Sequence, residues 1–335
     1  MQTIIQPLAF HSALLRGAQK VEGKRDELNR INGFPVPDRD TGNNLAYLMQ
    51  QLRRQLPAPQ SFEELLGKLC EVSLINARGN SGAIFSQYFS GFKEAAADLK
   101  QSITEMLPLH VLALMFNQGY TSAFRSIQKP REGTIISAMR SFAEGFHRLL
   151  VQGGDLLQAA EGALSDLRHT VRQTASILPQ QRALRAPDAG AMAFLHFVEG
   201  FLSALLGRED EDNEADIAMQ AGIAAEMADE VHVELDADEQ SAYRYCTEVL
   251  VKLAREDDIT EGMKAKLAAL GDSMVVSRSA GIARVHLHTD RPQQAVDLME
   301  ELGALMEVKA DDMRMQQALA SPHPGKTALI IDSIA

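Results

Sequence analysis

The spacing of apolar side chains in the first 207 residues constrains the fold more than any other feature of the sequence. These side chains recur at helical intervals, and almost nowhere before position 207 do they alternate with the two-residue period of a strand. Helices are predicted at residues 7–31, 42–56, 61–74, 84–92, 108–127, 133–151, 155–177 and 190–206. We therefore predict an all-helical domain over residues 1–207.

The pattern changes beyond this domain. Residues 208–230 are rich in Asp and Glu, which is typical of a solvated linker, and their Ala and Met content favours a helix over 213–228. The strands predicted after the linker are 231–235, 245–253, 273–278 and 283–289, and the helices are 259–270 and 292–303. We expect an α+β domain over residues 231–320, so the fold class is a multidomain protein with an all-α part followed by an α+β part.

Residues 321–335 contain an apolar strand, Leu329 to Ile331, followed by Asp332 and Ser333. Many α/β domains begin in this way. The segment is either a tail or the start of a truncated third domain. An apolar strand without a partner is a poor terminus, which favours the second interpretation.

Composition excludes several classes of protein. The net charge of −12 argues against a nucleic-acid backbone as the main partner, because such binding needs a basic surface. Cys70 and Cys246 are far apart in sequence and give no disulfide framework, and Cys70 is predicted to lie in the core. Residues 1–9 lack the features of a signal peptide, and no apolar run reaches the roughly 18 residues of a membrane span. We expect a soluble, cytoplasmic protein.

The stretch from residue 32 to residue 44 reads Asn-Gly-Phe-Pro-Val-Pro-Asp-Arg-Asp-Thr-Gly-Asn-Asn. Pro35 and Pro37 stiffen the chain directly before a predicted helix, which Asp40 or Thr41 can cap. Asp38 and Asp40 repel each other unless a cation lies between them, and oxygen ligands of this kind suit Mg²⁺. An acidic helix cap without a ligand is the alternative.

Three more polar breaks, at residues 76–82, 132–134 and 187–191, also lie directly before apolar helices. The first, Asn-Ala-Arg-Gly-Asn-Ser-Gly, would direct backbone amides and a hydroxyl at a phosphate from the positive end of a helix. Each break taken alone is equally compatible with ordinary helix capping. If the helices are antiparallel, alternate helices present their N-termini at the same end of the domain. The four breaks would then form one nucleotide and metal site.

His286 and His288 are two residues apart in a predicted strand, so their side chains point to the same face. With Cys246 from a neighbouring strand they could form a three-ligand Zn²⁺ site with an open position. Asp290 or Glu248 could be a fourth ligand or a group that orients a histidine. A polar sheet face without metal and a phosphate relay through histidine are the alternatives.

The motifs of both halves resemble the ATP-binding subunit of bacterial fatty acid kinase. In the helical half the resemblance rests on residues 34–38, 40–42 and 77–82, with 132–134 and 188–190 following in the expected order. In the α+β half it rests on residues 245–248, 271–273, 285–290 and 313–314. The resemblance implies an antiparallel helical barrel of the dihydroxyacetone kinase (DhaL) type, followed by the middle domain of that kinase. Residues 331–335 resemble the opening strand of a DegV-type fatty-acid-binding domain, which suggests a fusion protein.

The resemblance also implies ATP and Mg²⁺ as cofactors. It assigns the metal to Asp38 and Asp40 as the catalytic pair, with Asn32 completing or orienting that shell. The residues that it places around the phosphates are Thr41, Asn43, Asn44, Gly79, Asn80 and Ser81. The residues that it places at the nucleoside end are Thr134, Asp188 and Gly190. No protein nucleophile is needed in the helical domain, because phosphoryl transfer requires mostly positioning and charge neutralisation.

On this basis the expected reaction is phosphorylation of a fatty acid carboxylate to an acyl phosphate, as part of lipid metabolism, with the lipid presented by a DegV-type domain and the kinase acting as a homodimer. A kinase for dihydroxyacetone or another small hydroxy substrate is the second reading. Arg39 departs from the family, which usually has a small residue between the two carboxylates. Pairing of Arg39 with Asp38 or Asp40 would take the place of the cation, so a catalytically silent nucleotide-binding or scaffold protein is the third reading.

Overall fold

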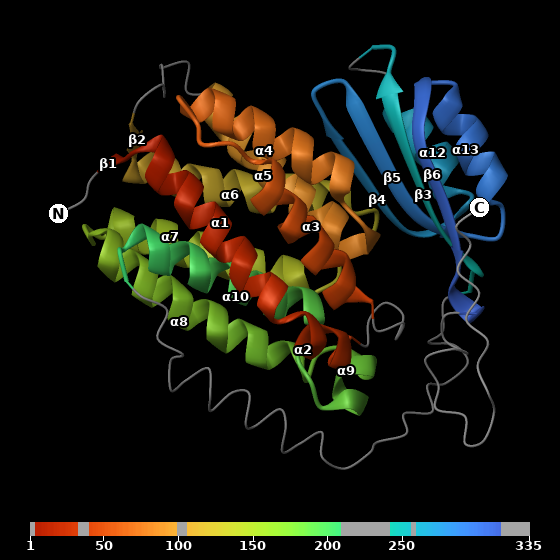
Figure 1. Ribbon diagram of the computed structural model, residues 1–335. Coiled ribbons are helices and arrows are strands. Elements are labelled where there is room, and N and C mark those ends of the chain that lie inside the picture. The colour runs from red at the N-terminus through yellow and green to blue at the C-terminus, as the bar shows by residue number, and fades with distance from the viewer. Residues whose placement is uncertain (1–3, 33–39, 99–105, 209–241, 256–258, 316–335) are drawn as a thin grey trace.

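The computed structural model describes residues 4–32, 40–98, 106–208, 242–255 and 259–315 (Figure 1). The predicted helix over 213–228, the strand over 231–235, the segment 321–335 and, apart from Arg208, the linker lie outside these ranges.

The described part of the first 208 residues folds mainly into packed helices, which confirms the prediction from periodicity. Their bounds are α1 Pro7–Gly23, α2 Arg25–Arg30, α3 Thr41–Gln55, α4 Phe62–Asn76, α5 Gly79–Asp98, α6 Leu109–Ser126, α7 Ile135–Val151, α8 Leu156–Thr174, α9 Pro179–Leu184 and α10 Ala189–Leu205.

Three details of this part differ from the predictions. The helix predicted over 7–31 is interrupted at Lys24, next to the helix-weakening Gly23, and the short α2 then packs on α3. The short α9 was not predicted. A two-stranded antiparallel ribbon joins β1 (Ile4–Ile5) to β2 (Leu107–Pro108), so the domain is not entirely helical. Strands of two residues are too short to produce a recognisable alternation.

Aromatic side chains occupy the centre of the helical domain. Phe10 of α1 contacts the rings of Phe62, Phe92 and Phe201 edge to face, with ring centroids 5.7, 6.2 and 5.3 Å away. All four side chains are buried. Contacts of this geometry add to the hydrophobic stabilisation of the core, and they join α1 to α4, α5 and α10.

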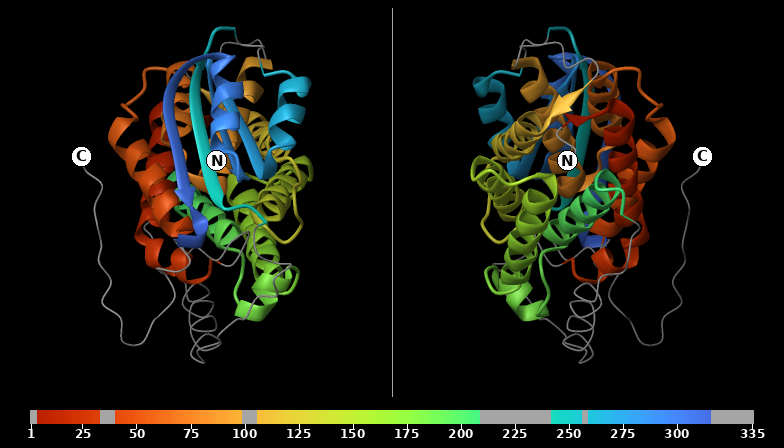
Figure 2. Two further views of the ribbon diagram at one scale, coloured as in Figure 1. Left: turned by 90° about the vertical axis from the view of Figure 1, so that its right-hand side faces the viewer. Right: turned by 90° about the vertical axis from the view of Figure 1, so that its left-hand side faces the viewer.

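The β-sheet lies beside the helical domain (Figures 1 and 2). Its strands are β3 (Tyr245–Leu253), β4 (Gly271–Ser279), β5 (Ile282–Thr289) and β6 (Gly303–Asp312), and all neighbouring pairs are antiparallel in the order β4-β5-β3-β6. The helices α12 (Glu261–Ala268) and α13 (Pro292–Glu300) cover the face that points away from the helical domain. Strand β6 was not predicted from the sequence, because its half-exposed side chains do not alternate clearly.

Alternation along β3 and β5 separates an apolar face from a polar one. Val249, Val251, Val285 and Leu287 pack against α12 and α13. The residues that alternate with them along β3 and β5 point to the helical domain, and β4 contacts the same domain. Ser277 Oγ donates to the carbonyl oxygen of Ala83, 3.2 Å away, and Val275 joins the core of the helices. The polar face of the sheet is therefore largely buried against α4, α5 and α6.

Among the described residues, no helix is both long enough and apolar enough to cross a membrane.

Helices α1 and α10 cross closely at a pair of glycines. A Cβ atom added at Gly200 would lie 2.7 Å from the carbonyl oxygen of Arg16 and 3.0 Å from Cα of Gly17. Both obstacles are backbone atoms, so a rotamer change cannot relieve the clash. By contrast, an added Cβ at Gly67 of α4 would meet nothing within 4 Å.

We predict that Gly200→Ala lowers the free energy of unfolding by about 1–3 kcal/mol, the usual cost of overpacking. Gly67→Ala is the matched control, and it should raise the free energy of unfolding by about 0.5–1 kcal/mol because alanine favours a helix. Urea denaturation followed by circular dichroism measures both values. Equal stability changes in the two variants would contradict the close crossing.

Candidate functional site

The N-termini of α3, α5, α7 and α10 meet at one end of the helical domain. A Cβ atom added at Gly190 of α10 would lie 3.2 Å from Cβ of Ile135, the first residue of α7, and 3.4 Å from Ser81 Oγ of α5. An added Cβ at Gly79 of α5 would lie 2.8 Å from Asn44 Nδ2 of α3. The structure thus brings together the helix starts that follow the four polar breaks.

The start of α3 is held by side chains on both sides of the segment 33–39, which contains Asp38 and Arg39 and lies outside the described residues. Asp40 occupies the N-cap position, although its side chain makes no capping hydrogen bond. Thr41 Oγ1 donates to Oδ1 of the buried Asn32 at 2.9 Å. These contacts place Asp40 at the same end of the helical domain as the starts of α5, α7 and α10.

Asn29 of α2 is a residue that sequence reasoning missed. Its Oδ1 accepts from the backbone N–H of Asn43 at 3.1 Å, and its Nδ2 donates to Asn43 Oδ1, also at 3.1 Å. Asn29 therefore supplies the capping contact that Asp40 does not, from a neighbouring helix. A single Asn in the predicted helix over 7–31 gave no sequence signal for this role.

The α4–α5 turn, residues 76–81, joins the two helices in a conformation that depends on glycine. Gly79 has φ +60°, in the left-handed region that glycine adopts without strain. Asn80 Oδ1 is buried and makes no hydrogen bond to any described residue. Arg78 stacks on Tyr47, with Cζ 3.6 Å from the ring centroid.

The α7 and α10 starts carry the residues predicted for the nucleoside end. Thr134 is the N-cap residue of α7, and its Oγ1 donates to Arg131 O at 2.7 Å. Asp188 is the N-cap residue of α10 and accepts from the N–H of Ala191 at 2.8 Å. Asp188 is 4% exposed. Burial raises its pKa to about 6, against the opposing effect of the backbone N–H groups that it accepts from.

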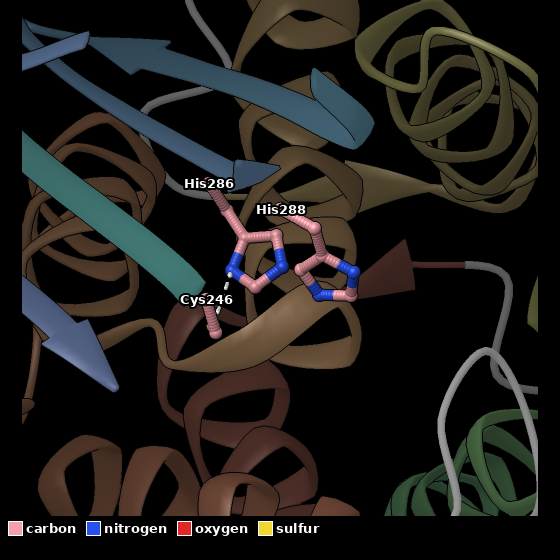
Figure 3. Close-up of side chains that lie close together, drawn as sticks. All are labelled: Cys246, His286 and His288. Carbon is pink, nitrogen blue, oxygen red and sulfur yellow. Dashed lines mark hydrogen bonds between the residues drawn. The ribbon is translucent and has the colours of Figure 1, made fainter. Parts of the chain in front are cut away.

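Cys246, His286 and His288 lie together on the polar face of the sheet, as predicted, and we call them the Cys/His cluster. Each offers a ligand atom within 4.8 Å of the other two. The ring of His286 lies between Cys246 and His288 (Figure 3), with Nδ1 3.8 Å from Cys246 Sγ and the two ring centroids 5.3 Å apart. His286 Nε2 and His288 Nδ1 are buried and form no hydrogen bonds within the described chain.

Two carboxylates flank the cluster, and Asp290 is not one of them. Asp290 Oδ1 accepts from the N–H of Arg244, away from the cluster. Glu248 Oε1 lies 3.1 Å from His286 Nδ1, and Asp272 Oδ1 lies 3.6 Å from His288 Nδ1. The fourth-group candidate Glu248 is thus beside the cluster, whereas Asp290 is not.

Glu248 also reaches the helical domain. Its Oε1 accepts from the N–H of Gly79 at 2.6 Å, and its Oε2 accepts from Arg284 Nη1 at 3.0 Å. Burial raises the pKa of Glu248, but the hydrogen bond and charge of His286 and the charge of Arg284 outweigh burial and lower this pKa to about 2. Glu248 is therefore an ionised, buried carboxylate at the start of α5.

The chain matches two family models. The model described as "DAK2 domain" matches residues 35–203, half of the chain, and the model of the FakA-like middle domain of fatty acid kinase matches residues 242–319. The chain belongs to the DAK2 domain family, and a FakA-like middle domain follows. Together the two matches support a kinase-type, nucleotide-binding function.

Relatives of known sequence are longer than this chain. An uncharacterized protein of Staphylococcus haemolyticus is 28% identical over 314 residues, which cover 92% of this chain and 55% of the relative. An uncharacterized protein of Staphylococcus saprophyticus is 27% identical over 326 residues, which cover 96% of this chain and 58% of the relative. The chain thus spans little more than half of the length of these relatives.

Solved structures of the dihydroxyacetone kinase of C. freundii are also similar. The native form has a TM-score of 0.44 at 18% identity and covers 58% of this chain and 34% of the kinase. The form in complex with AMP-PNP and Mg²⁺ has a TM-score of 0.43 at 18% identity and covers 59% and 33%. These likenesses are too distant to transfer a ligand or an activity to this chain.

The buried Asp188 predicts a specific pH dependence of stability. Its pKa is raised above the value in the unfolded chain, so the stabilising contribution is complete below about pH 4 and is lost as pH rises through about 6. Asp188→Asn keeps an oxygen that can accept from Ala191 and removes the charge. We expect it to raise the free energy of unfolding at pH 8 by about 1–3 kcal/mol, and to have little effect at pH 4.

Asp155→Asn is the control, because Asp155 caps α8 in the same way at a half-exposed position. Urea denaturation at pH 4 and pH 8 gives the comparison. An equal pH dependence in the two variants would show that the burial of Asp188 has no such effect.

Proposed function

We propose that the chain is an ATP-dependent phosphotransferase whose nucleotide binds where α3, α5, α7 and α10 begin. The observation that carries this proposal is the convergence of these four N-termini. The first turn of a helix leaves backbone N–H groups without intrahelical acceptors and carries a partial positive charge. Several such ends directed at one place favour a polyanion such as a triphosphate.

The residues present fit a nucleotide with Mg²⁺. Asn80 Oδ1 is a buried acceptor for which the described residues provide no donor, and such an oxygen can bind Mg²⁺ or accept from a ligand N–H or O–H, although it cannot bond to a phosphate oxygen. In this proposal Gly79, Asn80 and Ser81 cradle the phosphates, Asn43 and Asn44 support them, and Thr134, Asp188 and Gly190 line the nucleoside end. The absence of a Cβ at Gly79 and Gly190 keeps the helix starts close together.

Asp38 and Asp40 would hold Mg²⁺ beside the phosphates. Carboxylates combined with phosphate oxygens and water are the usual ligands of this ion. The bond from Thr41 to Asn32 ties the two ends of the intervening segment together, which supports a role for Asn32 in orienting the metal shell. Thr41 would support the phosphates together with Asn43 and Asn44. When bound, Mg²⁺ neutralises charge that develops on the transferred phosphoryl group.

The acceptor that we propose is a fatty acid carboxylate, presented by a DegV-type domain in the full-length protein or on a separate chain. The match to a FakA-like middle domain of fatty acid kinase supports this choice over a small hydroxy substrate. The greater length of the relatives leaves room for a further domain. We also propose that the protein acts as a homodimer.

The Cys/His cluster fits Zn²⁺ by its chemistry. One sulfur and two imidazole groups are a common donor set for zinc, with one coordination position left open. His286 Nε2 forms no hydrogen bond to any described residue, whereas Nδ1 faces both Cys246 Sγ, at 3.8 Å, and Glu248 Oε1, at 3.1 Å. A carboxylate beside a zinc-bound histidine often orients its ring. Cys246, His286 and His288 would hold the ion, which would act as a structural centre or as a Lewis acid.

Nucleotide binding tests the phosphotransferase proposal directly. Titration of the protein with AMP-PNP and Mg²⁺ in a calorimeter should show binding, and Asp38→Ala and Asp40→Ala should each abolish its Mg²⁺ dependence. Arg39→Gly should leave the affinity unchanged or increase it, and a loss of affinity would show that Arg39 is itself a ligand of the nucleotide. Absence of binding at millimolar nucleotide would favour the scaffold reading.

The acceptor is tested with this chain, radiolabelled ATP and a separately purified DegV-type protein loaded with fatty acid. We expect transfer to a fatty acid bound to a DegV-type protein and none to dihydroxyacetone. Asp40→Ala should remove the transfer, which excludes a contaminating kinase. Transfer to dihydroxyacetone alone would contradict the fatty acid proposal and retain the kinase.

Zinc is tested by elemental analysis of protein without an affinity tag. About one zinc per chain is expected under metal-replete conditions. Cys246→Ser should lose most of the metal, whereas Cys70→Ser should keep it, because Cys70 is buried in α4 with its Sγ near Phe89 O. Equal zinc content in the two variants would remove the cluster as the binding site.

A further inference from the structure

The α4–α5 turn lies against a buried ion pair from the sheet. Arg284 donates from Nε to the carbonyl oxygen of Leu74 at 3.1 Å and from Nη2 to that of Ile75 at 2.6 Å. These carbonyls belong to the last turn of α4. Glu248, paired with Arg284, accepts from the N–H of Gly79 at the first turn of α5.

The two charges match the two helix ends that they touch. The C-terminus of a helix carries partial negative charge and favours a cation, and the N-terminus favours an anion. Arg284 thus stabilises the end of α4 and Glu248 the start of α5. The side chains of both residues are at least 96% buried, so solvent screens these interactions very little.

Glu248 makes a third contact, with His286 of the Cys/His cluster. Its Oε1, the atom that accepts from Gly79, lies 3.1 Å from His286 Nδ1. One carboxylate oxygen therefore joins the start of α5 to the central member of the cluster. The path from cluster to turn runs through two hydrogen bonds.

We propose that Glu248 is a positioning residue that makes the affinity for nucleotide depend on whether the Cys/His cluster holds a metal ion. This proposal rests on the proposed function. A metal held by the cluster restrains the ring of His286, and through it the carboxylate that fixes Gly79. The turn is then ordered before the nucleotide arrives, so binding costs less conformational entropy. By linkage, nucleotide binding strengthens metal binding to the same degree.

The test compares the affinity for Mg²⁺ with AMP-PNP in protein stripped of metal and in protein loaded with one equivalent of zinc. In the wild-type chain, zinc should lower the dissociation constant about fivefold or more. In Glu248→Gln the affinity should be low and the effect of zinc should disappear. Glu307→Gln is the matched control, because Glu307 also binds Arg284, at 2.9 Å, but from a half-exposed position on β6. It should keep the full effect of zinc.

A zinc effect of the same size in Glu248→Gln and the wild type would overturn the proposal, as would unchanged nucleotide affinity in wild-type protein that binds zinc. If Glu248→Gln does not fold, Glu248→Asp replaces it, since the shorter side chain keeps the charge but cannot reach both partners. If the wild type binds no nucleotide in either state, the phosphotransferase proposal fails, and the coupling fails with it. If it binds nucleotide but no zinc, the coupling alone is overturned.

Discussion

Positive helix ends repel one another, and the helical domain directs four of them at a single place. The first turn of each carries N–H groups without intrahelical acceptors and a partial positive charge, so a close approach of the four requires compensating negative charge. One buried carboxylate, Glu248 at the start of α5, provides part of it. The glycines at positions 79 and 190 allow the approach, and a magnesium triphosphate would supply the remaining negative charge.

The sheet contributes to this end of the domain rather than standing apart from it. Its apolar face has its own core with α12 and α13, and its polar face presents Arg284 and Glu248 to the α4–α5 turn. Removing one member of such a buried pair usually costs more than the pair contributes, because the remaining charge is left uncompensated. The two parts of the chain therefore depend on each other at the place where we propose that phosphate binds.

Local sequence was sufficient to predict the long helices and the strands β3, β4 and β5, because apolar periodicity in α7 or β5 reflects which face is buried. It was also sufficient to predict that the polar breaks at α3, α5, α7 and α10 converge, given antiparallel packing. It could not reveal Asn29 and Arg284, whose partners lie far away in sequence or in another element. Glu248 was recognised only as a neighbour of the cluster, since its bond to Gly79 spans 169 positions. The half-exposed β6 left no clear pattern.

A crystal structure of this chain with AMP-PNP and Mg²⁺ tests the central claim most directly. The phosphates should lie against the backbone N–H groups that open α5, with the metal between them and the carboxylates of Asp38 and Asp40. A nucleotide bound elsewhere would contradict the claim. So would the guanidinium of Arg39 in the position expected for the metal.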